Sequence, residues 1–214
     1  MILAALTRAE EHLAGLVAHS LRTWDEGWTT RLKAEGMALP PNGSLLCEPA
    51  NPADIADVER RLGLRLPASY RAFLEHTDGT LSAWTAMPSQ EYPRWAGFLP
   101  CRFVTWFATL NPVWARSIAE LTEGLDEPDR SAANLRWVGR PPGEFPPVDP
   151  SFLRTTVQVS ASRQGSVVLL NPSVVNHAGE WETWDLRTQM KGARRHPSFA
   201  AFLEAQATTL ELRI

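Results

Sequence analysis

One stretch constrains the fold of this chain more than any other: RLGLRLPASYRAFLEHTDG, residues 61–79. A helical pattern ends there at Gly63, and glycine readily takes the left-handed conformation found after helix ends. Pro67 follows four residues later. Proline disfavours helix at the residue before it, but it can itself start a new helix. The stretch closes on Asp78-Gly79, a turn signal. The sequence therefore predicts two helices joined by a short extended segment, the elbow, at residues 63–67. A tight turn at Asp78-Gly79 follows the second helix.

The first of these helices is expected to begin at Asn51-Pro52, where asparagine can cap a helix and proline fits its first position. Apolar residues then recur at helical spacing in both helices. These are the predicted core residues: Ile55, Val58 and Leu62 in the first helix, and Tyr70, Phe73 and Leu74 in the second.

The first 50 residues precede this pair of helices. Apolar residues at helical spacing predict a helix over residues 2–21 and a shorter one over 23–33, followed by a loop over 38–50. We therefore divide the chain into an N-terminal helical extension, residues 1–50, packed on a main domain, residues 51–214.

After Gly79 the chain changes to short segments rich in Val, Thr, Trp and Phe, which are typical of strands. Six strands are predicted, over residues 81–86, 102–108, 135–139, 155–161, 166–171 and 180–186. Val167–Leu170 is apolar throughout, as in a strand that is covered on both faces. Ser198 can cap a closing helix. The order of helices, strands and a last helix predicts an α+β domain.

The composition bounds the class of protein. The 214 residues are 44% hydrophobic and 21% charged, as in ordinary globular domains, and the net charge of −3 gives no support to nucleic-acid binding. Cys47 and Cys101 have neither zinc-ligand nor disulfide spacing. No secretion signal or membrane-length apolar run is visible. We therefore expect a soluble cytoplasmic protein with reduced cysteines and no membrane contact.

Histidines and carboxylates offer little catalytic pattern. The glycine in His177-Ala-Gly-Glu180 indicates a hairpin turn, and no HExxH spacing accompanies it. Glu180 and Glu182 should point to the same side of a strand, where two carboxylates could act as acid and base. We favour the other interpretation, a solvated face or ion pairs with nearby arginines. We accordingly expect no enzyme, no metal site and no cofactor.

Two proline-containing loops are the better candidates for binding a protein partner. In PSQEYPRWAGFLP (88–100), Trp95 either folds back over the sheet edge or anchors a protein partner. In PPGEFPPVDP (141–150), Phe145 either wraps against the body or is presented to a partner. The candidate partner-binding residues are these aromatic side chains and nearby acidic ones: Asp78, Glu91, Tyr92, Trp95, Glu144, Phe145 and Asp149.

The stretch IADVERRLGLRLPASYRAFLEHTDG (55–79) resembles the N-terminal signature of the SUKH superfamily, which includes fungal regulators of cell-wall assembly and many bacterial proteins. The shared features are an apolar helix with Glu59, then LG, then LP, then Tyr70-Arg71-x-Phe73-Leu74 and Gly79. GSVVLLNPSVVNHAGEWETWDL and HPSFAAFLE resemble the C-terminal part of bacterial members. The resemblance covers about residues 51–205.

This resemblance implies a compact α+β fold with a twisted, mainly antiparallel sheet flanked by helices. It also implies protein binding rather than catalysis. Many bacterial members resemble immunity proteins that neutralise polymorphic toxins, whereas fungal members act as regulatory scaffolds. The implied partner is therefore a toxin domain or, as the alternative, an endogenous protein. In the first case the acidic loop residues would face basic groups on the toxin.

Overall fold

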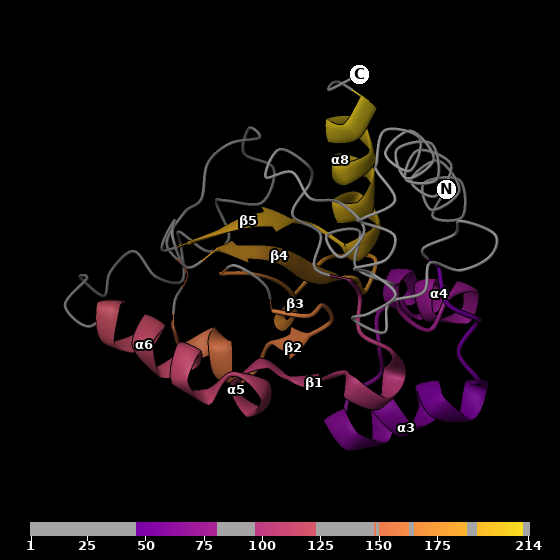
Figure 1. Cartoon of the computed structure of the whole chain (residues 1–214), viewed down its shortest axis with the longest axis horizontal. Helices are drawn as coiled ribbons and strands as arrows, with labels where there is room; N and C mark the ends of the chain where they lie inside the picture. The colour runs from indigo at the N-terminus through magenta and orange to yellow at the C-terminus, as the bar shows by residue number, and fades with distance from the viewer. Residues whose placement is uncertain are drawn as a thin grey trace, which may run out of the picture.

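A computed structural model of the chain describes residues 46–80, 97–122, 148, 150–162, 165–187 and 192–211. In these ranges one five-stranded antiparallel sheet has its strands side by side in chain order, with helices packed against it (Figure 1). This arrangement confirms the predicted α+β class. The helices predicted over 2–21 and 23–33 and the strands predicted over 81–86 and 135–139 lie outside the described residues. The division at residue 50 therefore stays a prediction.

The two helices predicted around the elbow are present: α3 (Pro52–Leu62) and α4 (Ala68–His76). The Asn51 side chain caps α3 by accepting a hydrogen bond from the Ala53 backbone N–H at 2.9 Å. Gly63 ends this helix in the left-handed conformation, with φ 66°. Pro67 stands immediately before α4. The six predicted core residues of the two helices are all buried.

The strand predicted over 102–108 is largely wrong. The chain forms instead η2 (Cys101–Phe103), β1 (Thr105–Trp106), α5 (Phe107–Leu110) and α6 (Pro112–Thr122). Contacts with distant residues explain the difference. The Arg61 guanidinium donates hydrogen bonds to the Cys101 and Val104 carbonyls, at 2.8 and 2.9 Å, and this holds the η2 turn. The Phe107 N–H then donates to the Thr156 carbonyl at 2.9 Å, after which the chain turns into α5.

A short 3-10 helix, η4 (Pro150–Arg154), precedes the remaining strands of the sheet, which are β2 (Val157–Gln158), β3 (Ser166–Val175), β4 (Trp181–Arg187) and β5 (Gly192–His196). β2 is shorter than the predicted 155–161, and Ser160 forms a bridge with Phe98 instead. β3 continues beyond its predicted end at Asn171 through a register shift against β4. β5 is not among the predicted strands, because GARRH lacks the β-branched and aromatic residues that indicate strands.

Two hydrophobic clusters pack on opposite faces of the sheet. Val168 and Leu170 of β3 belong to the first, whereas Val167 and Leu169 belong to the second, as expected for side chains that alternate along a strand. All four are buried, which confirms that this strand is covered on both faces. The first cluster contains residues of α3, α4 and the closing helix, including the rings of Tyr70, Phe73, Phe98, Phe199 and Phe202.

The closing helix α8 (Phe199–Glu211) begins as predicted. The Ser198 Oγ accepts a hydrogen bond from the Ala201 N–H at 3.1 Å, and Phe199, Phe202 and Leu203 are buried. In the part of the chain that the structure describes, no helix combines the length and the apolar character that a membrane span requires.

Candidate protein-binding surface

Asp78 is the predicted partner-binding residue that the structure describes. The other six lie outside the described residues: Glu91, Tyr92, Trp95, Glu144, Phe145 and Asp149. Asp78 is half-buried in the turn after α4. Its Oδ1 accepts a hydrogen bond from the Cys101 N–H at 2.6 Å, and its own N–H donates to the Glu48 carbonyl at 2.7 Å. This side chain therefore fixes the turn against η2.

The two ends of the segment that contains Tyr92 and Trp95 are fixed to one another. The Thr80 N–H donates to the Phe98 carbonyl at 3.0 Å, and the Phe98 N–H donates to the Thr80 Oγ1 at 2.9 Å. Leu46 forms an antiparallel bridge with Thr80 on its other side. The described residues on either side of 81–96 are therefore held together.

The two cysteines have little nucleophilic character. Burial, together with the hydrogen bond and the negative charge of Asp78, raises the pKa of the Cys101 thiol to about 12. Burial and Asp78 also raise the pKa of the Cys47 thiol, against the opposing effect of Arg102. Because the thiolate is the reactive form, neither side chain resembles an activated nucleophile.

The three carboxylates around β4 have separate internal partners. Glu180 binds Ser69 at the start of α4, whereas Asp185 accepts hydrogen bonds from Arg187, the closest at 2.8 Å, and from Ser166. Glu182 contacts Arg195 of β5. Glu180 and Glu182 therefore do not form an acid/base pair, because Glu180 precedes the strand and reaches α4. The prediction that these carboxylates form ion pairs with nearby arginines is confirmed for Glu182 and Asp185.

The contact between Glu182 and Arg195 is a buried two-point ion pair. The Arg195 Nε and Nη2 donate to the two Glu182 carboxylate oxygens at 2.6 Å each, and both side chains are 1% exposed. The Trp184 Nε1 donates to the same carboxylate at 2.7 Å. The hydrogen bonds satisfy the buried charges, as such pairs require. They leave no accessible carboxylate for chemistry here.

His196 is also buried, next to the Phe202 ring at 5.3 Å between centroids. Burial lowers the pKa of His196 to about 4; Asp185 opposes this shift and Arg194 adds to it. The imidazole is therefore neutral at neutral pH. Within the described ranges, His, Cys, Asp and Glu side chains do not gather in a group that could hold a metal ion.

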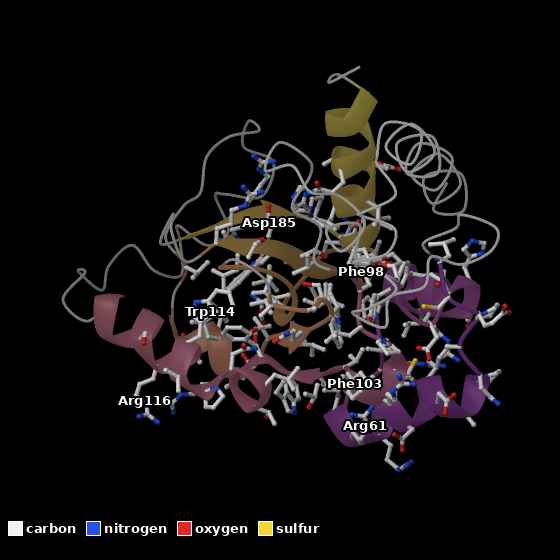
Figure 2. The ribbon with its side chains drawn as sticks, viewed as in Figure 1. Arg61, Phe98, Phe103, Trp114, Arg116 and Asp185 are labelled. Atoms are coloured by element: carbon white, nitrogen blue, oxygen red, sulfur yellow. The ribbon has the colours of Figure 1, made fainter. Side chains whose placement is uncertain are left out.

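Exposed apolar side chains gather instead along one edge of the molecule. Phe103, Leu110 and Val113 are 51%, 44% and 72% exposed, and Arg102 and Arg116 are exposed beside them. We call these five residues the η2–α6 edge. Figure 2 shows Phe103 and Arg116 on the side of the molecule that carries η2, β1, α5 and α6. The Arg102 guanidinium carbon lies 4.8 Å from the centre of the Phe103 ring, so a charge and an apolar surface are presented together.

The backbone that carries this edge is held from within. Arg61 fixes η2 through the two carbonyl contacts described above. Between Leu110 and Val113, the Asn111 amide Nδ2 donates to the Gln158 Oε1 of β2, and the Ser162 Oγ donates to the Asn111 Oδ1 at 3.1 Å. The edge therefore presents its side chains on a fixed frame, which reduces the entropy lost on binding.

Sequence reasoning missed this edge, because it assigned residues 102–108 to a strand and did not predict α6. One signal was present. Asn111-Pro112 at the start of α6 repeats Asn51-Pro52 at the start of α3, a pair that favours helix initiation. The exposure of Phe103 could not be inferred, because Phe103 belongs to the η2 turn, which Arg61 holds by hydrogen bonds to the Cys101 and Val104 carbonyls, 40 and 43 positions away in the chain.

Comparison with known families gives one match. The model of the SMI1 / KNR4 family (SUKH-1) matches residues 49–132, a range that includes α3, α4 and the whole η2–α6 edge. No curated protein matches the chain. The match confirms the resemblance drawn from residues 55–79, while the resemblance of the C-terminal segments lies beyond the matched range.

Proposed function

Since residues 49–132 match the model of the SMI1 / KNR4 family (SUKH-1), we propose that this chain is a non-catalytic protein-binding module, and that it binds and neutralises a toxin domain as an immunity protein. The observation that carries the proposal is the η2–α6 edge, where apolar side chains are exposed on a hydrogen-bonded frame. Large side chains held in this way are typical anchors of protein interfaces. Neutralisation would follow from occlusion, because a bound partner covers the working surface of the toxin.

The internal pairing of polar groups supports the non-catalytic part of the proposal. An active site usually contains an accessible acid, base or nucleophile with a perturbed pKa. In the described part of the chain, Glu182 and Asp185 are engaged with arginines, and the Cys101 thiol is held in its protonated form. His196 is buried.

The predicted loop residues complete the proposed contact surface. Tyr92 and Trp95 belong to the segment anchored at Thr80 and Phe98, and we propose that they contact the partner together with Glu91, Glu144, Phe145 and Asp149. Asp78 would act at the base of the first loop, where it fixes the turn to η2.

Co-expression tests this function. The C-terminal domain of a large secreted-type protein encoded next to this gene is produced in cells with and without the whole chain, and surviving cells are counted. We expect survival only with the chain, and co-purification of the two proteins. A toxic neighbour that kills equally in both cases would contradict the immunity role. A stable endogenous partner found without any toxic neighbour would favour a regulatory scaffold instead.

A further inference from the structure

We infer that the η2–α6 edge docks an acidic segment of the protein partner, with partner carboxylates on Arg102 and Arg116 and partner apolar groups on Phe103, Leu110 and Val113. This inference rests on the proposed protein-binding function. It adds the chemistry of the partner segment that this edge takes, which the proposed function leaves open.

The local charge is the first support. The whole chain has a net charge of −3, but residues 97–119 contain the two arginines of the edge and no aspartate or glutamate. On the neighbouring helix α3, Asp57 is already paired with Arg60 and Arg61. Among the described residues, the ion pairs join other side chains, and neither Arg102 nor Arg116 takes part in one. The five residues of the edge therefore carry two positive charges and no negative one. The nearby carboxylates include Asp78, which acts on Cys101 and already accepts a hydrogen bond from the Cys101 N–H, and Glu120 follows Arg116 on α6. The two arginines complement an acidic segment of a partner.

The distribution of apolar side chains is the second support. The structure describes four large apolar side chains that are exposed, and three of them lie within residues 103–113; the fourth is Val175 in β3. Val113 and Arg116 are three positions apart on α6, so they share one face of that helix. At the other end of the edge, Arg102 lies over the Phe103 ring. Each end of the edge therefore has an apolar side chain next to an arginine.

The same arginines could in principle meet a nucleic acid, but the surroundings favour a protein. Nucleic-acid surfaces combine many basic groups in a stripe or patch, and they bind mainly through phosphates. Here two arginines stand at the ends of three apolar residues, on a chain of net negative charge. Mixed apolar and arginine contacts are the usual composition of the centre of a protein interface.

The test uses site-specific cross-linking in the cells that carry the gene. A photo-reactive phenylalanine analogue replaces Phe103, Val113 or, as the matched control, Val175 in the whole chain. We expect one protein to be cross-linked from positions 103 and 113 and not from 175. We also expect its cross-linked peptide to contain more acidic than basic residues. Cross-links to RNA or lipid, a basic contact peptide, equal labelling from 175, or no product from 103 and 113 would each overturn the inference.

Charge reversal supplies a second readout. Arg102→Glu combined with Arg116→Glu should weaken binding of the cross-linked protein at least ~10-fold, whereas Arg65→Glu, an exposed arginine of the elbow, should leave it within ~2-fold. Unchanged binding in the double variant would also overturn the inference. If co-expression rescues the cells but these positions give no cross-link, this surface is wrong and the proposed function stands. If both experiments fail, the proposed function fails with it.

Discussion

The Glu180 carboxylate caps helix α4 through Ser69, a residue 111 positions earlier in the chain. The Ser69 N–H donates to Glu180 Oε1 at 2.9 Å, and the Ser69 Oγ–H donates to Glu180 Oε2. Pro67, the residue before α4, makes no side-chain cap of its own. A residue from the β3–β4 connection therefore accepts a hydrogen bond from a free backbone N–H at the start of α4, and it adds a negative charge where the helix dipole favours one.

We therefore expect Glu180→Ala to lower the free energy of unfolding by about 1–2 kcal/mol, the usual contribution of a helix cap. Urea denaturation followed by circular dichroism measures this change. Glu75→Ala is the matched control, because Glu75 is an exposed residue of α4. It should change the stability by less than about 0.5 kcal/mol. Equal effects of the two substitutions would show that the contact with Ser69 contributes nothing to stability.

Gly79 should tolerate no side chain. Its φ is +85°, and a Cβ there would lie 2.7 Å from the Phe98 carbonyl oxygen and 2.8 Å from the Pro100 nitrogen. Gly79→Ala combines left-handed strain with a backbone clash, and we expect a loss of about 3 kcal/mol or more. Gly179→Ala has a similar φ of +75° in open space, so about 1–2 kcal/mol is expected. Thermal and urea unfolding compare the two; a smaller loss at Gly79 than at Gly179 would refute the close approach.

The buried pair of Glu182 and Arg195 should show strong coupling. Arg195→Met leaves an unpaired buried carboxylate and should lower stability by about 3–5 kcal/mol. Adding Glu182→Gln removes that charge while keeping an acceptor for Trp184 Nε1, so the double variant should regain most of the loss. A double-mutant cycle from urea unfolding measures the coupling. Additive losses would mean that the two side chains act independently.

His196 should make the protein lose stability as the pH falls. Its folded pKa of about 4 is below the ordinary value of 6.5, so between these values the unfolded chain binds a proton that the folded chain excludes. The free energy of unfolding due to this group is complete above pH 6.5. It decreases toward pH 4 by up to about 1.4 kcal/mol per pH unit.

His196→Phe keeps a ring against Phe202 and removes the titration, so its stability should depend less on pH in this window. Urea unfolding at half-unit steps from pH 7.5 to 4.5 gives both curves. Parallel curves for the two proteins would exclude His196 as the source of the acid sensitivity.

The helix pair around the elbow could be predicted because its signals are local. Asn51 and Gly63 act on backbone groups within a few residues of themselves, so their roles can be inferred without knowledge of the fold. The buried segment Val167–Leu170 and the Ser198 cap are local in the same sense. For the candidate site, the role of Asp78 in partner binding stays a prediction. The η2–α6 edge could not be predicted, because the composition of residues 102–108 is typical of a strand.

What the sequence by itself determined is thus the α+β class, the elbow between α3 and α4, the central strands and the start of α8. Only the tertiary structure decided three features: residues 101–103 form a turn that Arg61 holds by a hydrogen bond, Glu180 caps α4, and Glu182 pairs with Arg195. Caps, turns and apolar periodicity depend on neighbours along the chain. These three contacts join residues 40, 111 and 13 positions apart, and such pairs exist only after the helices and strands have packed.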